Sequence, residues 1–599
     1  MQVLKRTIGL TFNEENGTAT IRVWAPEAKQ VQLKTDQLQL ALAQEEMGYW
    51  SASTDAIVPG DRYQMAIDGQ LFPDPASLSQ PEGVHGRSEV LNLSCEWQDA
   101  NWRNPALEDY IIYEVHTGTF SEAGTFEGIA ARLDHLLELG ITAVEIMPVA
   151  AFPGERNWGY DGVFPFAVQH SYGGARGLQE FIQLCHAKGL AVILDVVYNH
   201  LGPEGNYLPE FGPYFTSKYQ SPWGAAINFD DANCDGVRQF VIENVLMWFR
   251  DFHVDALRLD AVHAIKDYSA LHLLQEIRQY TDELMQESGK VHYLLAECDL
   301  NDPRYISPVS NNGMGMDGQW VDEFHHALRR SAGEEARGYY ADFSGVADLA
   351  KSFEDAYVYT GAYSQERKRR FGQPATGHPG RQFIVFSQNH DQVGNRMLGE
   401  RSSQLYSFGM QKLMAAAVLF SPYVPLLFMG EEWAASSPFL YFVSHGDETL
   451  IQQVREGRSA EFAEMHAGGT APDPQDPETF EASKLKWTEL SSAPGQQLFN
   501  WYKLLIGLRK SEPMLRCQEH SITKTHVYEE ERCLVLERSA TDSGSLICCF
   551  LNFSAVPARL SLPPGIALIQ KIADSSEVGD NEPEHLQPES FIAYSAQYV

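Results

Sequence analysis

The sequence predicts an α/β protein built around a (β/α)8 TIM barrel, with a β-sandwich domain before it and another after it. Three observations support this fold class. Short alternating strands fill roughly the first hundred residues, buried apolar runs alternate with helical segments over the middle of the chain, and strand patterns return after Ser511. A doubly wound sheet is the alternative, but the chain lacks the glycine-rich phosphate turn that is typical of that fold.

Eight segments have the apolar character of barrel strands. Seven are clear and the last is weaker: Tyr110–Val115, Ala143–Met147, Ala191–Val197, Val254–Leu259, Val291–Ala296, Gln382–Phe386, Pro425–Met429 and Gln319–Asp322. Helical spacing lies between them, for example at Ile129–Leu139 and Gly177–Ala187, and the second of these ends in the lysine and glycine common at helix C-termini. Eight strands alternating with helices favour a barrel with insertions.

The flanks predict three domains, at residues 1–105, 106–510 and 511–599. Strands are expected in the first domain at Thr20–Trp24, Val31–Leu33, Gly48–Trp50 and Arg62–Ile67, and in the third at Thr525–Tyr528, Cys533–Glu537, Leu546–Leu551 and Phe591–Tyr594. The proline-rich segment Phe72–Gly83 is predicted to be an irregular linker. The polar stretch Ser444–Lys486 is predicted to be a surface excursion late in the barrel.

Composition limits the partners and the compartment. The 599 residues contain 80 Asp and Glu against 45 Lys and Arg, a formal charge of −35. Nucleic acids and anionic membranes require basic faces, so neither is an expected partner and a neutral ligand is favoured. We find no signal segment and no apolar run of about 18 residues, the length that would span a membrane. The 8 cysteines are dispersed without a CxxC pair, as in reducing compartments, so we expect a cytoplasmic protein.

Carboxylates follow four of the predicted barrel strands at the points where the strands end. The segments are Asp195–His200, Arg258–His263, Ala296–Glu297 and Asn389–Asp391. A barrel collects its chemistry at these ends, and a carboxylate beside a buried run is costly unless it is paired or used. Arg258 projects to the same side of its strand as Asp260 and can keep that carboxylate ionised. The apolar run before Glu297 favours a raised pKa and a transferable proton. The two carboxyls therefore suit the nucleophile and the general acid/base of glycoside hydrolysis.

Two other chemistries are weaker. His200, His263 and His390 could belong to a metal site, but their spacing matches neither H-E-x-x-H nor an EF-hand loop, and Asn199 alone does not make a calcium site. A serine hydrolase would need a G-x-S-x-G elbow, which the chain lacks. We expect no metal and no cofactor.

In order, the four segments resemble the four signature regions of the α-amylase superfamily, and the resemblance covers the whole barrel and both β flanks. It implies that Asp260 is the nucleophile, Glu297 the general acid/base and Asp391 the stabiliser of the transition state. It also implies that Tyr160 stacks on the sugar in subsite −1. Further substrate contacts are expected from Asp195, His200, Arg258, His263, Asn389, His390, Trp158 and Trp223, with Trp433 as another stacking candidate.

Within the superfamily the closer resemblance is to maltooligosyltrehalose trehalohydrolases. It is carried by Asp255–Ile265, Leu295–Pro303, Asp317–His326, Asn389–Arg396, Tyr214–Asn228 and Leu427–Trp433. The resemblance implies a retaining hydrolase that cuts the α-1,4 bond next to the terminal trehalose of an α-glucan and releases free trehalose. The first domain is similar to glucan-binding modules. Cys298 departs from the asparagine that the pattern has after the acid/base glutamate.

Three alternatives remain open at this point. A branching or debranching enzyme acting at α-1,6 bonds is disfavoured by the Asp391–Asn395 run, and a plain α-amylase by the amino-terminal domain. A non-catalytic glucan-binding protein is disfavoured because Asp260, Glu297 and Asp391 are all intact. The resemblance also implies a metabolic partner that forms the trehalose end of the substrate.

Overall fold

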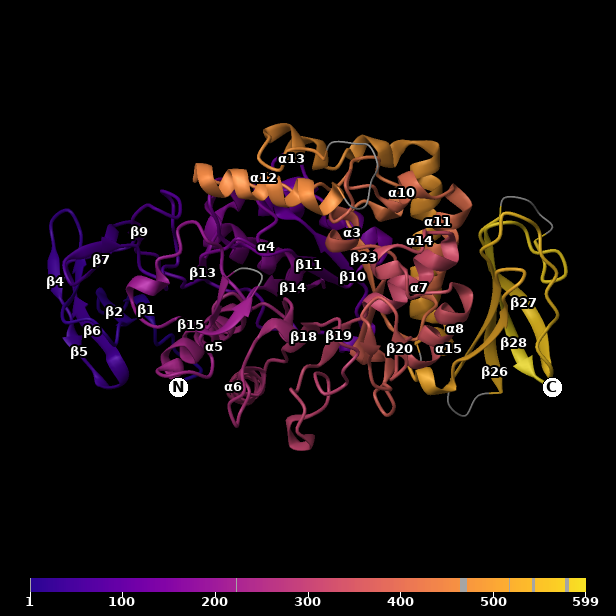
Figure 1. The fold of residues 1–599 in the computed structure, drawn as a ribbon, viewed down its shortest axis with the longest axis horizontal. Coiled ribbons are helices and arrows are strands. Elements are labelled where there is room, and N and C mark those ends of the chain that lie inside the picture. The colour runs from indigo at the N-terminus through magenta and orange to yellow at the C-terminus, as the bar shows by residue number, and fades with distance from the viewer. Residues whose placement is uncertain (1, 222–223, 464–470, 517, 541–543, 577–580) are drawn as a thin grey trace.

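The computed structural model describes residues 2–599 except 222–223, 464–470, 517, 541–543 and 577–580. The amino-terminal sheets lie at one end of the molecule, the carboxy-terminal sheet lies at the other, and the barrel lies between them (Figure 1). No helix in the described part of the chain has the length and apolar character needed to cross a bilayer.

The amino-terminal domain contains two antiparallel sheets, as predicted. One has the order β1 (Gly9–Asn13), β2 (Thr18–Trp24), β6 (Tyr49–Thr54), β5 (Ala43–Gln44), and the other β4 (Gln39–Ala41), β3 (Val31–Lys34), β7 (Arg62–Ile67), β8 (Gln70–Phe72), with β9 (Ser88–Glu89) paired to β7. Alternate residues of β2 are buried, which gives the period-two pattern that predicted it. Trp24 at the end of β2 packs edge-on against Tyr214, 5.1 Å between ring centroids, and so joins this domain to the barrel.

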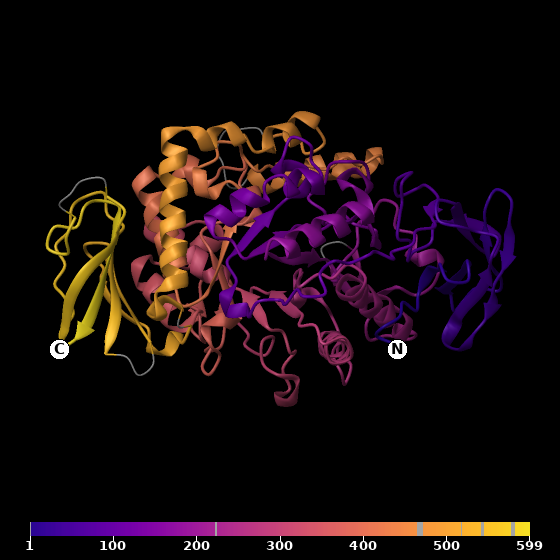
Figure 2. The ribbon, with the colours of Figure 1, turned by 180° about the vertical axis from the view of Figure 1, so that it is seen from behind.

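Eight parallel strands close the barrel, and every predicted strand is confirmed, including the weaker eighth. Their order is β10 (Ile112–Val115), β11 (Ala143–Ile146), β14 (Ala191–Val196), β17 (Ala256–Leu259), β18 (Tyr293–Glu297), β19 (Gly318–Trp320), β22 (Phe383–Phe386), β23 (Val424–Phe428). The main helices between and after them are α4 (Gly174–Ala187), α5 (Cys234–Arg250), α6 (Leu273–Ser288), α7 (Asp322–Ala332), α8 (Val346–Asp355), α11 (Phe408–Leu419) and α14 (Ala493–Ser511). Seen from behind, α14 runs along the side of the barrel that faces the carboxy-terminal sheet (Figure 2).

The barrel interior is layered, and the layers position the site. Ile112, Ala143, Ile193, Ala256 and Leu295, on five consecutive strands, belong to one buried apolar cluster. Because side chains two residues apart share a face of a strand, the next inward layer is formed by the residues two positions later on the same strands. Those five residues are Glu114, Glu145, Asp195, Arg258 and Glu297. An apolar plug therefore supports a ring of ionisable side chains at the carboxyl ends of the strands.

One local prediction needs correction, and another gains detail. The segment Ile129–Leu139 is not one helix but the end of α2 (Phe126–Ala130) and then α3 (Leu133–Leu139), which stops at Gly140 in the left-handed conformation. The polar excursion Ser444–Lys486 contains the helices α12 (Glu448–Ala463) and α13 (Pro477–Ser483).

The carboxy-terminal domain is antiparallel β, as predicted, and its described strands form one sheet. The order is β24 (Lys524–Tyr528), β25 (Cys533–Ser539), β26 (Ser545–Asn552), β28 (Ser590–Tyr598), β27 (Ile566–Asp574). The edge strand β27 was not predicted. Helices α8 and α11 contact the sheet and join it to the barrel.

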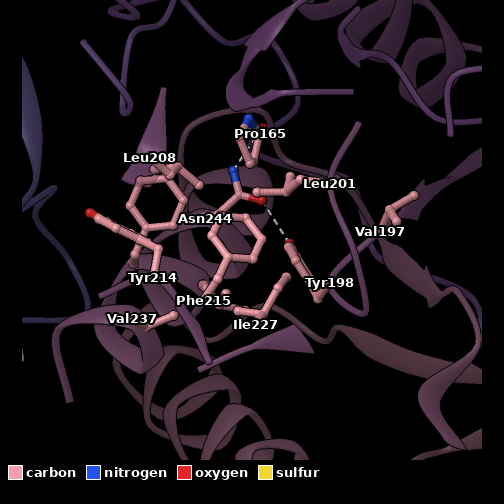
Figure 3. A pocket seen from close by; sticks show the side chains of 12 residues that line it. Pro165, Val197, Tyr198, Leu201, Leu208, Tyr214, Phe215, Ile227, Val237 and Asn244 are labelled. Carbon is pink, nitrogen blue, oxygen red and sulfur yellow. Dashed lines mark hydrogen bonds between the residues drawn. The ribbon is translucent and has the colours of Figure 1, made fainter. Parts of the chain in front are cut away.

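Beside the barrel, an apolar pocket lies between the loops after β14 and helix α5 (Figure 3). Its volume is about 20 Å³, enough for one water molecule but far too small for a sugar. Tyr198 donates a hydrogen bond to Asn244 in its wall, 2.7 Å, so this pocket is internal packing.

Candidate active site

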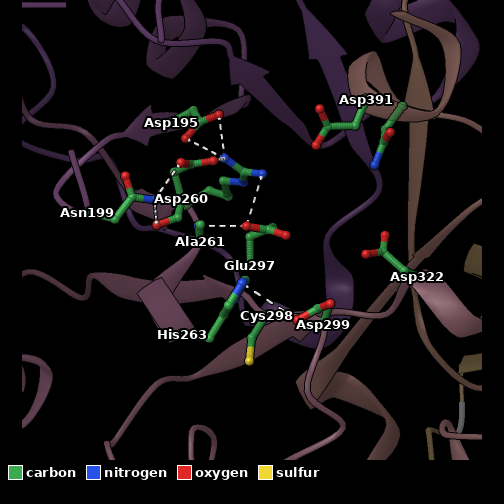
Figure 4. A network of polar contacts seen from close by, with 12 residues as sticks. Asp195, Asn199, Asp260, Ala261, His263, Glu297, Cys298, Asp299, Asp322 and Asp391 are labelled. Atoms are coloured by element: carbon green, nitrogen blue, oxygen red, sulfur yellow. Dashed lines mark hydrogen bonds and ion pairs between the residues drawn. The ribbon is translucent and has the colours of Figure 1, made fainter. Parts of the chain in front are cut away.

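Arg258 is the centre of the ionisable ring. Its side chain is fully buried, and its Nη1 lies 2.9 Å from both carboxylate oxygens of Asp195 and 2.8 Å from Oδ1 of Asp260 (Figure 4). The guanidinium also lies over the Trp320 ring, 4.5 Å from its centroid. Charge-assisted bonds of this kind stabilise the ionised carboxylate, so the predicted pairing of Arg258 with Asp260 is present and extends to Asp195.

The backbone after β17 brings Asp260 and Glu297 to the same place. Asn199 donates to Oδ2 of Asp260 at 2.8 Å and to its main-chain oxygen at 3.1 Å, which fixes the side chain. The next residue, Ala261, has φ +38, a left-handed conformation that residues other than glycine adopt rarely and mostly at functional sites. This turn points the Ala261 N–H at Oε2 of Glu297, 2.6 Å away.

Burial raises the pKa of Glu297 well above its ordinary range. Arg258, with Nη2 at 3.9 Å from Oε2, acts in the opposite direction, whereas the carboxylates of Asp260, Asp322 and Asp391 reinforce burial. The raised pKa of Glu297 favours its protonated form, which a general acid requires. Asp260 instead accepts hydrogen bonds from the Arg258 guanidinium and the Asn199 amide, the contacts that suit a nucleophilic carboxylate.

A second chain of hydrogen bonds begins at Glu114, a residue that sequence reasoning missed. Glu114 accepts from both the backbone N–H and the ring Nδ1 of His390. The other ring nitrogen lies 2.7 Å from the Tyr160 hydroxyl, which in turn donates to Asp195 at 2.6 Å. Burial lowers the pKa of His390, but Asp391 and Glu114 outweigh burial and raise it to about 9. Both ring nitrogens then carry protons at neutral pH, and the chain of donors leads from His390 through Tyr160 to Asp195.

Asp391 faces a pocket of about 430 Å³ beside the ring. Its walls carry polar and aromatic groups from α7, α9 and the segments between barrel strands, among them Asp322, Asp299, His326, Tyr339 and Gln392. Burial, with Asp391 and Asp299 adding to it, raises the pKa of Asp322 to about 7. His326 and Tyr339 stack on each other, 4.8 Å between ring centroids. This pocket has room for a small sugar and supplies both hydrogen-bonding groups and an aromatic surface.

The remaining predicted residues differ in where they lie. The His200 ring contacts the Asn199 side chain and, at 3.0 Å, the main-chain oxygen of Tyr160. The His263 ring lies near Glu297 in Figure 4 and 3.6 Å from Asp299. Trp158 and Asn389 make structural contacts, and their contacts with substrate stay predictions. Trp158 is 4% exposed and stacks on Phe439 behind His390, and the Asn389 side chain caps a short helix, α9 (His390–Gly394). Trp223 lies outside the described residues. Trp433 is buried against His135 and Trp487, away from the ring.

Glu145 is the other residue that sequence reasoning missed in the ring. It is the register partner of Glu114 on the next strand, is 1% exposed, and has no hydrogen-bond partner for either carboxyl oxygen among the described residues. Burial, with Glu114 adding to it, raises the pKa of Glu145 well above its ordinary value. A glutamate inside a buried apolar run is the signal that marks both Glu114 and Glu145 in the sequence.

The described part of the chain contains no group of three or more His, Cys, Asp or Glu side chains arranged to hold a metal ion. The cysteines at the described positions are all free. Cys298, directly after Glu297, is 4% exposed and lines the 430 Å³ pocket, so the residue that departs from the family pattern lies on the pocket wall.

Comparisons with known proteins agree with this geometry. The alpha-amylase catalytic-domain family matches residues 70–223. The chain is 46% identical to the malto-oligosyltrehalose trehalohydrolase of Saccharolobus solfataricus, over 84% of this chain and 87% of that protein. It is 42% identical to the enzyme of the same name from a Rhizobium species, over 93% and 95%. A Salmonella typhimurium crystal structure, assigned provisionally as an alpha amylase, superposes with a TM-score of 0.90 at 35% identity and covers 99% of this chain and 100% of that one.

The barrel, with an acidic site at the carboxyl ends of its strands, defines a glycoside hydrolase of the α-amylase superfamily. The relatives narrow this class. The chain belongs to the malto-oligosyltrehalose trehalohydrolase family.

Proposed function

We propose that this protein hydrolyses the α-1,4-glucosidic bond next to the terminal trehalose of maltooligosyltrehalose and releases free trehalose and a maltooligosaccharide. The chain is similar over most of their length to relatives named malto-oligosyltrehalose trehalohydrolase, which supports this choice of substrate. The observation that carries the reaction is the position of the Arg258 guanidinium beside both Asp260 and Glu297, together with the burial that raises the pKa of Glu297.

The mechanism we propose is retaining double displacement. Glu297 protonates the glycosidic oxygen while Asp260 attacks the anomeric carbon, which breaks the glycosidic bond and forms a covalent glycosyl-enzyme. Free trehalose leaves with the proton from Glu297. Ionised Glu297 then takes a proton from water, and the resulting hydroxide releases the maltooligosaccharide from Asp260. Asp391 stabilises the positive charge that develops on the sugar ring in both transition states.

Substrate contacts follow from the two sides of the ring. On the side of Tyr160, we propose that Tyr160, Asp195, His200, Arg258 and His390 bind the glucose unit whose bond is cut. Asp195 and Arg258 act there largely by fixing their neighbours. On the other side we propose that the 430 Å³ pocket takes the trehalose unit, with His263 at its edge. A pocket lined by acidic and aromatic groups suits a neutral disaccharide.

We also propose that the protein is a cytoplasmic enzyme without nucleic-acid or membrane partners, as its composition favours. An enzyme that forms the trehalose end supplies its substrate. We retain residues 1–105, 106–510 and 511–599 as the proposed domains, the first as a glucan-binding-module-like unit. The −35 formal charge and the neutral substrate support this assignment.

Parallel digestion of maltotetraosyltrehalose and maltohexaose tests the proposal. We expect rapid release of trehalose from the first substrate and little cutting of the second. Comparable cutting of both would make the protein a general α-glucan hydrolase. Activity on neither would favour a branching-type enzyme or a non-catalytic glucan-binding protein.

A further inference from the structure

Two tyrosines, the exposed Tyr268 and the half-buried Tyr219, form an aromatic pair on the catalytic face of the barrel. Tyr219 lies on β15 (Phe215–Ser221), and Tyr268 lies in the loop between β17 and α6. Their ring centroids are 5.9 Å apart with planes inclined by 42°. Tyr268 is 79% exposed, the most exposed aromatic side chain in the described part of the chain.

One carboxylate fixes both tyrosines. Oδ2 of Asp230 accepts from the Tyr219 hydroxyl at 2.7 Å and from the backbone N–H of Tyr268 at 3.0 Å. Oδ1 of the same carboxylate is 3.0 Å from Nζ of Lys218, so the lysine beside the pair is already neutralised. The Tyr219 hydroxyl and the Tyr268 backbone are therefore held in place before any ligand arrives, and the lysine charge beside the pair is compensated.

The pair lies on the same face of the barrel as the active site. Tyr268 is eight residues beyond Asp260 in the chain, so the two lie no more than about 28 Å apart. Between them, Nζ of Lys266 donates to the main-chain oxygen of His263, 3.1 Å, which ties this loop to the rim of the site. β15 belongs to the loop after β14, on the same face. A glucan of several units bound at the site can extend as far as this surface.

We infer that Tyr219 and Tyr268 form a second binding surface for the α-1,4-glucan chain, outside the cleft in which the bond is cut. Exposed aromatic rings have amphipathic character, with an apolar face for the C–H groups of a sugar ring and a hydroxyl that reaches water. The acidic chain disfavours anionic ligands, and the neutralised lysine leaves hydrophobic stacking as the main attraction. The inference rests on the proposed action on α-glucan chains and adds a site that keeps a long chain near the cleft.

The test is affinity electrophoresis in native gels that contain soluble amylose. All proteins carry Asp260→Asn so that the polymer stays intact. Tyr268→Ala removes the exposed ring, Tyr268→Phe keeps the ring without its hydroxyl, and Tyr363→Ala removes another exposed tyrosine, 51% exposed, as the matched control. Because the Tyr268 ring is mostly in water, its removal leaves no cavity, and equal thermal midpoints verify the fold.

We expect Tyr268→Ala to raise the apparent dissociation constant for amylose about two- to tenfold, and the other two variants to match the parent. Unchanged retardation of Tyr268→Ala would overturn the inference, and so would an equal loss in Tyr363→Ala. The readout does not require turnover. If trehalose release fails while retardation depends on Tyr268, the proposed reaction is wrong and the surface stands; the reverse result removes only the surface.

Discussion

Replacing Glu114 by glutamine tests the chain of hydrogen bonds that leads from Glu114 through His390 and Tyr160 to Asp195. Glutamine keeps the shape of the side chain and one acceptor oxygen, but it removes the negative charge next to the His390 ring. A hydrogen bond to a charged group contributes about 1.5–3 kcal/mol, and one pKa unit equals about 1.4 kcal/mol. The pKa of His390, raised to about 9 in the wild type, should fall by about one to two units, into the range of about 7–8.

The functional consequence depends on which group donates to the Tyr160 hydroxyl. As pH rises through the His390 pKa, Nε2 loses its proton and becomes an acceptor. The Tyr160 hydroxyl can then donate to His390 in place of Asp195. The alkaline limb of the kcat/KM profile for trehalose release should therefore move to lower pH in Glu114→Gln.

Glu145→Gln is the matched control for this prediction. Glu145 is the register partner of Glu114 on the next strand, and burial raises its pKa well above its ordinary value, which favours the uncharged form that the amide resembles. Its alkaline limb should match the wild type. If Glu114→Gln also kept the wild-type limb, or if Glu145→Gln moved as far as Glu114→Gln, the account of this ring would be refuted.

Three further predictions concern the acid/base, the pocket and stability. Glu297→Gln should lower kcat about 10²- to 10⁴-fold with an unchanged thermal midpoint, and wild-type turnover would remove Glu297 from its role. Asp322→Asn should raise KM for maltotetraosyltrehalose more than it lowers kcat, because Asp322 lines the proposed trehalose pocket; an effect on kcat alone would contradict that placement. His186 lies within 2.9 Å of Asp255 and 3.0 Å of Asp99, and although burial lowers its pKa, these carboxylates outweigh burial and raise it. The stability that it contributes is full below about pH 6.5 and is lost as pH rises through the raised pKa. The midpoint difference between wild type and His186→Gln should therefore shrink with rising pH, and a constant difference would count against the linkage.

The sequence was most informative where one strong rule applies. Barrel strands are buried on both faces, so their apolar runs stand out, and the residues at their carboxyl ends meet whatever their separation in the chain. Asp195, Arg258, Asp260, Glu297 and His390 were predicted together for that reason, and the structure brings them together.

The failures have physical causes as well. Glu114 and Glu145 lie inside apolar runs, which marks them as unusual, but the runs do not show that the two are register partners or which charged groups they meet. Trp158 and Asn389 lie within matched motifs, and the linear pattern does not show that the first packs against Phe439 or that the second caps α9. The break between α2 and α3 leaves the helical spacing intact, so periodicity does not detect it. The missed strand β27 is an edge strand with two register shifts, which weaken its alternation.

One proton NMR time course on maltotetraosyltrehalose follows both the bond that is cut and the stereochemistry of the cut. Free trehalose signals should grow in step with a maltooligosaccharide whose new reducing end is first the α-anomer, the outcome of two displacements through Asp260. A first-formed β-anomer would mean single displacement and would contradict Asp260 as the nucleophile. Reducing sugars without free trehalose would contradict the assignment of the bond.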